Sequence, residues 1–306
     1  MHKNASYFPL WAKLYLYYKG NTKNHRGKRS VLRLLHAIGL RQNIPFVWRM
    51  QNGVQLAISP FEGFAPWSVG WTCFEHGVWE PHIERLLRSL LKPGDTAMDI
   101  GANIGYFSGV MAQSVGSKGK VWSFEPVPST FSQLKLSQQL NGFSNMTPFQ
   151  VALGSEEERA EIRYDPAIMG SASMHTKKTD AMQTSIVDVV RLDDLIEEGT
   201  VSRPALIKMD AEGHEQFVLI GAQRLIREAK PKIIFEYNSE AAALAGWELK
   251  DLGKLLLSCG DYKFYSLEGG IFTIIDTESY VVAEKQYVDF LATCDESKPQ
   301  ELAGVE

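Results

Sequence analysis

Residues 93–108 read PGDTAMDIGANIGYFS, and the rest of the chain can be interpreted outward from this run. The segment 96–100 (TAMDI) is a short apolar run of the kind that forms a buried strand, and a helix is expected from about Ile104 to Ser114. Between them, Gly101 and Gly105 let the backbone turn sharply and approach a ligand closely. A strand, a glycine-rich loop and a helix in this order are typical of an α/β protein.

Strands and helices alternate on both sides of this run. Upstream, a hairpin is expected over 46–58 with a type I′ turn at Asn52-Gly53, followed by a helix over about 81–91. Downstream, strands are predicted at 120–125, 146–153, 204–210 and 232–236, helices at about 129–140, 214–227 and 241–257, and a final hairpin at 262–275. This alternation predicts a mostly parallel sheet with helices on both faces and an antiparallel C-terminal edge hairpin.

Carboxylates end the first two of these strands, at Asp99 and Glu125. The loop between strand and helix departs from the GxGxxG pattern of a dinucleotide site, because Asn103 stands where the second glycine belongs. A carboxylate near a helix start repels a pyrophosphate and attracts a sulfonium or ammonium group, while Glu125 can accept hydrogen bonds from ribose hydroxyls. The two acids therefore favour S-adenosylmethionine over NAD. The alternative is that the glycines only permit close packing and that Asp99 caps the following helix.

A series of short motifs supports the same cofactor. They are WEP (79–81), PGDTAMDIGANIGYFS (93–108), VWSFEPVP (121–128), VALG (151–154), RLDDL (191–195), IKMDAEGHE (207–215), LIGA (219–222) and IIFE (233–236). In this order and spacing the chain resembles the FkbM-type family of S-adenosylmethionine-dependent methyltransferases over roughly residues 75–275. The resemblance implies a Rossmann-like class I methyltransferase fold with a seven-stranded sheet. It also implies O-methylation of a hydroxyl on a sugar, glycan or secondary metabolite.

The resemblance also assigns residues to the cofactor. It implies that four residues of the glycine loop hold the methionyl part, that Glu125 holds the ribose and that the backbone near Ala152 faces the adenine; the four are Asp99, Gly101, Asn103 and Gly105. Glu80 matches an acid that precedes the family's core and is expected either to reach the cofactor or to interact with the dipole of the helix that it begins.

The segment DAEGHE at 210–215 carries the densest cluster of candidate bases in the chain. Transfer of a methyl group to a hydroxyl needs a group that manages the hydroxyl proton, so Asp210, Glu212 and His214 are the candidate catalytic residues. Histidine has the best-matched pKa at neutral pH, although a single histidine is more often a surface or capping residue. Glu215 is interpreted as part of a solvated helix face.

A metal offers a rival mechanism. Asp210 together with Glu236 and Asn238, at the end of the 232–236 strand, provides oxygen ligands suited to Mg²⁺, which would polarise a substrate diol. This arrangement resembles that of the Mg²⁺-dependent O-methyltransferases.

The connection between the strands at 146–153 and 204–210 is far longer than usual. Its part at 155–185 contains MGSASMHTKKT (169–179), which is small and polar. We expect this part either to form a lid over the acceptor, with Ser171, Ser173 and His175 as contacts, or to be an ordinary mobile loop.

The net charge of −4 hides an uneven distribution of charge. Ten Lys and Arg side chains and no acidic ones precede Glu62, so the remainder carries −14. Trp and Tyr accompany these basic residues in the first 20 positions, which predicts binding of residues 1–50 to an anionic membrane surface. Packing of this arm on the acidic body or on a second subunit of a homo-oligomer is the alternative. The acidic body argues against a nucleic-acid substrate.

Length and composition complete the expectations. The 306 residues divide into a basic arm with a hairpin (1–74), a methyltransferase domain (75–292) and a frayed tail (293–306). Three dispersed cysteines and the lack of a signal peptide or a long apolar span predict a cytoplasmic protein, with peripheral binding at the inner membrane surface as a further hypothesis. An NAD-type oxidoreductase and a non-catalytic binding module of the same fold are the alternative functions.

Overall fold

The computed structural model describes residue 34 and residues 46–59, 69–166, 168, 170–177, 179–180, 182–268, 271–283 and 286–295. The hypotheses about the basic arm therefore lie outside the described residues, except for Leu34 and the hairpin that follows the arm. The turn residues Gly269 and Gly270 and most of the predicted tail also lie outside them.

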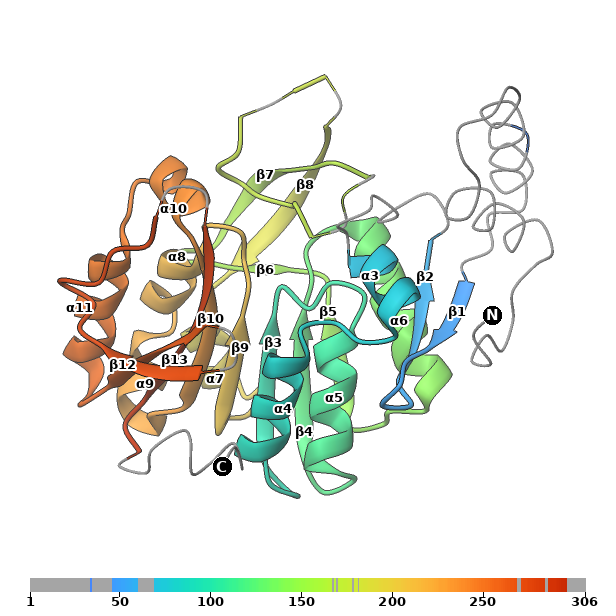
Figure 1. The fold of residues 1–306 in the computed structure, drawn as a ribbon, viewed down its shortest axis with the longest axis horizontal. Helices are drawn as coiled ribbons and strands as arrows, with labels where there is room; N and C mark the ends of the chain where they lie inside the picture. Colours follow the sequence, from blue (N-terminus) through green and yellow to red (C-terminus); the bar gives the residue numbers. More distant parts are fainter. Residues whose placement is uncertain are drawn as a thin grey trace.

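The centre of the molecule is an eight-stranded sheet in the order β12-β11-β13-β10-β9-β3-β4-β5 (Figure 1). Its strands are β3 (Thr96–Ile100), β4 (Lys120–Phe124), β5 (Met146–Phe149), β9 (Leu206–Met209), β10 (Lys232–Asn238), β11 (Lys263–Glu268), β12 (Ile271–Ile275) and β13 (Tyr287–Thr293). The five from β10 to β5 are parallel, and β13, β11 and β12 pair antiparallel with their neighbours. The α/β fold and the C-terminal hairpin are thereby confirmed.

The sheet has one strand more than the predicted seven. Strand β13 is inserted between β10 and β11, and the expected tail begins at its last residue, Thr293. The sequence analysed alone does not predict β13, because its partners β10 and β11 are distant in sequence. The two strands of a hairpin are easier to predict, because a short turn joins them. In the structure β13 buries Val288, Phe290 and Leu291 between two neighbours, so tertiary pairing makes it a strand.

Helices cover both faces of the sheet, as the alternation of side chains along each strand requires. They are α3 (Val69–His76), α4 (Pro81–Leu90), α5 (Tyr106–Val115), α6 (Pro128–Asn141), α7 (Leu192–Glu197), α8 (Glu215–Ile220), α9 (Gln223–Ala229), α10 (Ser239–Ala245) and α11 (Leu249–Cys259). On β3, Ala97 packs into a core with α4, α5 and α6, and its neighbour Met98 packs into a second core with α8, α9 and α11.

Two predicted helices are each divided in two. The helix expected at 214–227 breaks at Gly221, where a Cβ atom would lie 1.9 Å from the carbonyl oxygen of Gly154. The helix expected at 241–257 ends first at Gly246, whose φ is +86°, and restarts behind a capping box formed by Glu248 and Asp251. Both breaks lie at glycines that the periodicity of the apolar residues does not reveal.

The N-terminal hairpin consists of β1 (Phe46–Arg49) and β2 (Gln55–Ile58), as predicted, but its turn differs. Arg49 pairs with Gln55, so five residues connect the strands, and of these Gly53 alone has a positive φ, at +88°. A type I′ turn needs positive φ at two residues, so that prediction was wrong. The side-chain oxygen of Asn52 instead accepts a hydrogen bond from the N–H of Val54, and its amide nitrogen donates to Glu84 of helix α4.

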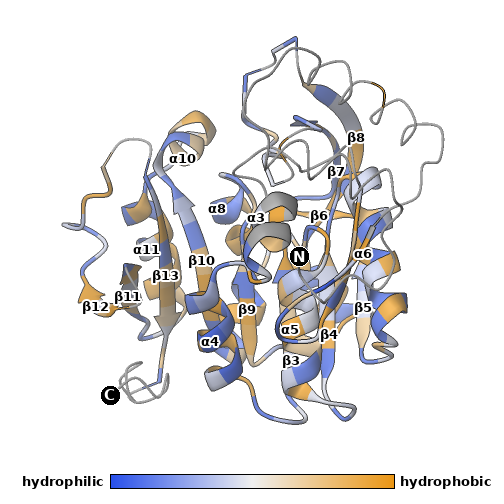
Figure 2. Cartoon of the chain, turned by 45° about the vertical axis from the view of Figure 1, so that its right-hand side comes forward, coloured by the Kyte–Doolittle hydropathy of each residue, from blue (hydrophilic) through white to orange (hydrophobic). Residues whose placement is uncertain are grey.

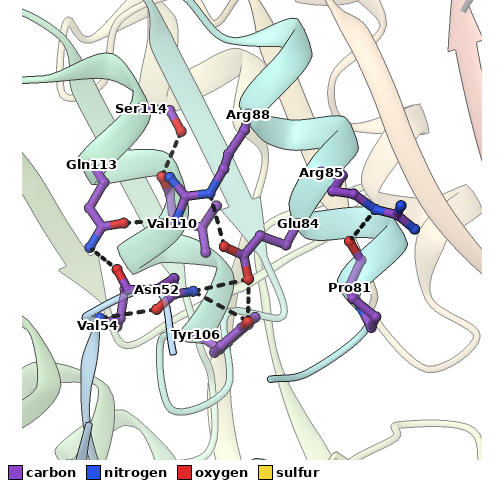
Figure 3. Close-up of polar contacts among 10 residues, drawn as sticks. All are labelled: Asn52, Val54, Pro81, Glu84, Arg85, Arg88, Tyr106, Val110, Gln113 and Ser114. Atoms are coloured by element: carbon purple, nitrogen blue, oxygen red, sulfur yellow. Dashed lines mark hydrogen bonds and ion pairs between the residues drawn. The ribbon is translucent and has the colours of Figure 1, made fainter. Parts of the chain in front are cut away.

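A polar network ties this hairpin to the body of the protein (Figure 3). The carboxylate of Glu84 on α4 accepts hydrogen bonds from the Asn52 amide, at 3.0 Å, and from the Tyr106 hydroxyl of α5. Arg88 binds both Glu84 and the side chain of Gln113, each at 2.9 Å. The hairpin also shares the hydrophobic core of α4 and α5, and Tyr106 is held in a fixed place beside the site described below.

A smaller three-stranded sheet in the order β6-β8-β7 contains β6 (Ala152–Leu153), β7 (Glu158–Tyr164) and β8 (Gln183–Val190). The predicted strand at 146–153 is therefore two strands in different sheets, because Ala152 pairs with Val189 of β8. An apolar run of eight residues carries no local signal for such a change of partner. Figures 1 and 2 both place β7 and β8 beyond the edge at which the parallel strands end.

Candidate functional site

Two adjoining cavities lie at the carboxyl ends of the parallel strands, where open α/β sheets bind their ligands. The β4 cavity is lined by Phe124, Glu125, Ala152 and His214 among others. The β10 cavity has a volume of about 660 Å³, within the range of small-molecule sites, and extends toward β10 and α10. Residues that line both cavities mark their common boundary; they are Gly101, Asn103, Asp210, Glu212 and Gly170.

The glycine loop after β3 brings this boundary close to β9. Gly101 has a φ of +75°, and a Cβ atom there would lie 1.8 Å from the carbonyl oxygen of Asp210. Asn103 also has a positive φ, at +51°, and its side chain accepts the N–H of Ile104 at 2.8 Å. Gly105 is the residue before helix α5 and has no side chain to cap it, whereas Asp99 accepts hydrogen bonds from the hydroxyl and the backbone N–H of Ser108 in the first turn of α5, as the capping alternative expects.

Glu125 lies at the floor of the β4 cavity. Its two carboxylate oxygens accept backbone N–H groups of Asn103, at 3.0 Å, and of Val127, at 2.9 Å. Burial raises the pKa of Glu125 to about 7, even though both hydrogen bonds favour the charged form. A carboxylate has about four acceptor sites, so two remain for a ligand in the cavity. The predicted proximity of Asn103, Glu125 and Ala152 is present in this cavity.

Asp99 lies deeper than Glu125. It is 1% exposed, its Oδ2 accepts the hydroxyl of Ser108, and it is absent from the described residues that line the two cavities. Burial raises the pKa of Asp99, and the nearby ammonium of Lys208 opposes that rise. The direct cofactor contact expected of Asp99 stays a prediction.

Lys208 is a residue that the sequence analysis missed. It lies on β9, is 5% exposed, and its Nζ donates to Oδ2 of Asp210 at 3.2 Å. Burial lowers the pKa of Lys208, but Asp210, Asp99 and Glu80 outweigh this effect and raise it. A signal was present, because residues two apart on a strand share a face and lysine is rarely buried without a partner.

The loop after β9 holds the candidate bases. Asp210 and Glu212 line both cavities, and Glu212 has a positive φ of +50°. Glu215 accepts the N–H groups of Ala211 and Gly213 and so shapes this loop. The expectation that Glu215 lies on a solvated helix face was wrong, because its carboxylate is the partner of these two donors and the residue is 2% exposed.

The environment of Glu212 gives it a high proton affinity. Burial, followed by the charges of Asp210 and Glu215, raises the pKa of Glu212 well above its ordinary value. The side chain of Asn238 forms a hydrogen bond with Glu212, and its Oδ1 already accepts two backbone N–H groups of α10, so the Asn238 amide is the donor. The hydrogen bond from Asn238 thus fixes the carboxyl group of Glu212 at the boundary of the two cavities.

His214 has a different environment from that of Asp210 and Glu212. It lines the β4 cavity and, among the described residues, is absent from the lining of the β10 cavity. Its Nδ1 is 2.9 Å from Nε2 of His175, and its ring stacks on Phe217 at 4.8 Å between centroids. Burial, with a smaller effect of His175, lowers the pKa of His214 to about 4, so the ring is neutral at neutral pH. All three candidate bases therefore line the β4 cavity, and among the described residues Asp210 and Glu212, but not His214, also line the β10 cavity.

The segment after β7 forms a wall between the two cavities. Ala172 and Met174 line the β4 cavity, and Ser171 and Ser173 line the β10 cavity. The Ser173 hydroxyl donates to the carbonyl oxygen of Glu212 at 2.8 Å. Of the three predicted substrate contacts, Ser171 and Ser173 reach the β10 cavity. His175 lies against His214 instead. The lid itself stays a prediction.

Two of the three candidate Mg²⁺ ligands have other partners in the structure. Asp210, Glu236 and Asn238 all line the β10 cavity. However, Asp210 is paired with Lys208, and the side-chain oxygen of Asn238 is occupied as the cap of α10. Among the described residues, no three His, Cys, Asp or Glu side chains form a group that could hold a metal ion. The residues present do not fit Mg²⁺, and we derive no step through a metal.

Glu80 projects into the β10 cavity from the start of α4. It is the residue that precedes α4, as the expected interaction with the helix dipole requires, although its backbone is left-handed, with a φ of +38°, and its side chain makes no cap hydrogen bond. Burial raises the pKa of Glu80 to about 7; the carboxylates Asp289 and Asp210 add to the rise, and Lys208 and His82 oppose it. Glu80 thus contributes a buried carboxyl group to the lining of the β10 cavity, and its backbone adopts a left-handed conformation there.

Glu80→Gln is expected to stabilise the ligand-free protein above neutral pH. Because the pKa of Glu80 is raised to about 7, the folded protein keeps a proton that the unfolded chain releases, so stability falls as pH rises from about 4.5 to 7. The neutral amide avoids this loss, which is on the order of 2–3 kcal/mol. Thermal unfolding at about pH 8 and pH 5 checks this, with a higher Tm for the variant at the upper pH and no gain at the lower. An equal increase in Tm at both pH values would contradict the burial of a charged Glu80. Glu157→Gln makes the same change at an exposed residue and is the matched control.

Among the described residues, no helix is both long enough and apolar enough to cross a lipid bilayer.

Comparisons with known proteins found a matching family model and several relatives. Residues 99–262 match the family model described as the methyltransferase FkbM domain. Hexuronic acid methyltransferase AglP of Haloferax volcanii is 30% identical over 178 residues, which cover 58% of this chain and 67% of AglP. The 31-O-demethyl-FK506 methyltransferase FkbM of Streptomyces tacrolimicus is 26% identical over 161 residues, or 44% and 61% of the two chains. A crystal structure of methyltransferase FkbM from Methylobacillus flagellatus aligns with a TM-score of 0.44 at 21% identity, over 67% of this chain and 47% of that one.

Proposed function

Because the chain belongs to the FkbM methyltransferase family, we propose that it transfers the methyl group of S-adenosylmethionine to a hydroxyl of a sugar, glycan or secondary metabolite. One observation carries this proposal: two cavities meet at a shared boundary of Gly101, Asn103, Asp210 and Glu212. Such a boundary lets a donor in one cavity face an acceptor in the other. The names of two relatives, a hexuronic acid methyltransferase and a 31-O-demethyl-FK506 methyltransferase, support a hydroxylated acceptor.

We assign the β4 cavity to the nucleoside part of the cofactor on the chemistry of its lining. The free acceptor sites of Glu125 suit the two ribose hydroxyls, and the apolar side chains Phe124, Ala152 and Leu153 suit the adenine face. Toward the β10 cavity, Glu80 and Asp210 offer carboxylates to the ammonium group of the methionyl part. When bound, the cofactor would supply an electrophilic methyl group on a cationic sulfur.

Glu212 is the proposed base for the acceptor hydroxyl. Its carboxylate lies at the boundary, and burial and neighbouring charges raise its pKa, so it has a higher affinity for the hydroxyl proton than an exposed glutamate has. The proton of the hydroxyl passes to the Glu212 carboxylate as the oxygen attacks. Asp210, held by Lys208 at 3.2 Å, keeps a negative charge beside the position where the cationic sulfur is expected.

Calorimetry and turnover assays test this function against its alternatives. We expect the full chain to bind S-adenosylmethionine and not NAD, and to release S-adenosylhomocysteine when hydroxylated acceptors are added, with a methyl group gained by the acceptor in mass spectrometry. Binding of NAD without binding of S-adenosylmethionine would support an oxidoreductase instead. Cofactor binding without any turnover would leave the non-catalytic module as the function.

A further inference from the structure

The β10 cavity is strongly acidic. Five carboxyl side chains line it, from the segment before α4, the loop after β9, strand β10 and helix α10; they are Glu80, Asp210, Glu212, Glu236 and Glu240. Among the described residues that line this cavity, Lys208 is the one Lys or Arg, and it is already paired with Asp210. When they are ionised, these five acids carry four negative charges more than the described Lys and Arg residues of the lining balance.

The cofactor accounts for part of this excess. Asp210 and Glu212 line both cavities, so they face the boundary where the cationic sulfur is expected. Glu236 and Glu240 line the β10 cavity and, among the described residues, are absent from the β4 cavity. Burial, and then the charges of Asp210 and Glu212, raises the pKa of Glu236 well above its ordinary value. These two acids remain for the acceptor.

Aromatic and apolar side chains form a second, independent feature of the same cavity. Tyr287 lines it from β13 and is 63% exposed, Leu244 lines it from α10 and is 43% exposed, and Trp79 lies on the side of Glu80. Exposed aromatic rings beside carboxylates suit a ligand that has both an apolar ring face and a positive charge, since the face of an aromatic ring attracts cations. The volume of about 660 Å³ accommodates such a ligand beside the methionyl part of the cofactor.

We propose that the acceptor is a sugar or polyol that carries an ammonium group and no carboxylate, with the ammonium between Glu236, Glu240 and Tyr287 and the reacting hydroxyl at Glu212. This inference rests on the proposed function and makes it more specific. It separates the chain from its relative AglP, a hexuronic acid methyltransferase, because a hexuronate would bring a further negative charge among these acids.

Matched acceptors test the proposal. The full chain is assayed for release of S-adenosylhomocysteine with three sets of methyl glycosides that differ at one substituent: amino sugars, neutral sugars and uronic acids. We expect kcat/KM to be at least about tenfold higher for amino sugars than for their neutral counterparts, which corresponds to about 1.4 kcal/mol, and lowest for uronic acids. Equal or faster turnover of neutral or uronic sugars would overturn the inference and leave the proposed function intact. An enzyme that uses none of the three sets but methylates another hydroxylated acceptor also overturns the inference and leaves the proposed function intact, whereas binding of S-adenosylmethionine without turnover of any acceptor contradicts the function itself.

Glu240→Lys provides an independent test on the protein side. Glu240 is exposed on the first turn of α10, so the change is compatible with folding. We expect the preference for amino over uronic sugars to fall at least about tenfold while the affinity for S-adenosylmethionine is unchanged. Glu157→Lys makes the same charge change in the exposed segment before β7, outside the described lining of both cavities, and should leave the preference as it is. Equal effects of the two variants would overturn the proposal.

Discussion

Glu212→Gln is expected to lower kcat by about 10²–10⁴-fold, the usual contribution of a general base. Glutamine keeps the shape of the side chain and can still accept a hydrogen bond from the Asn238 amide, but it cannot take a proton from the acceptor. The affinity for S-adenosylmethionine should change less than about threefold, because the variant removes neither the ribose acceptor nor the glycine loop. Initial rates of S-adenosylhomocysteine release, together with calorimetry, separate the two effects.

The pH profile makes this prediction specific to Glu212. The active form of a general base is the ionised one, so kcat/KM of the unmodified protein should rise as pH increases through the raised pKa of Glu212. In the variant this rise should disappear. Glu157→Gln, on the exposed segment before β7, should keep both rate and profile. If Glu212→Gln retained more than about a tenth of the activity with the same profile, Asp210 would be the better candidate for the base.

Gly101→Ala is expected to destabilise the protein by about 2–5 kcal/mol and to abolish measurable binding of S-adenosylmethionine. The added methyl group would lie 1.8 Å from the carbonyl oxygen of Asp210, and backbone cannot yield as a flexible side chain can. Two costs combine, since a left-handed backbone costs an L-residue about 1–2 kcal/mol and overpacking about 1–3 kcal/mol. Separation of the loops after β3 and β9 would also open the boundary between the two cavities.

Gly94→Ala is the matched control. Gly94 has a φ of +96°, similar to that of Gly101, but nothing lies within 4 Å of a Cβ atom built there. This variant should lose about 1–2 kcal/mol from backbone strain alone and bind the cofactor normally. Urea denaturation and calorimetry on both variants measure the difference. Equal losses of stability, or unimpaired cofactor binding by Gly101→Ala, would show that the contact between the two loops is unimportant.

Local sequence patterns were sufficient for the elements that carry the cofactor site. The apolar run TAMDI, the glycines at 101 and 105 and the acids at 99 and 125 are adjacent or regularly spaced, and they predict a strand, a loop and a helix without knowledge of the rest of the chain. The same local rules predicted the C-terminal hairpin, whose strands are joined by a short turn. Motif order then indicated the family, which the match over 99–262 confirms.

The remaining features depend on contacts between segments that are far apart in sequence. Strand β13, the change of sheet at Ala152 and the breaks at Gly221 and Gly246 follow from pairing or packing partners that no local pattern specifies.

The same holds for the chemistry of the site. The sequence by itself determined which acids follow β9, but only the tertiary structure shows that Lys208 is buried against Asp210 and that Glu212 lies at the boundary of both cavities. It also shows that His214 is buried against His175. The physical reason is that proton affinity and charge depend on burial and on neighbouring charges. Both are set by the distance between side chains in the folded chain and not by their spacing along it.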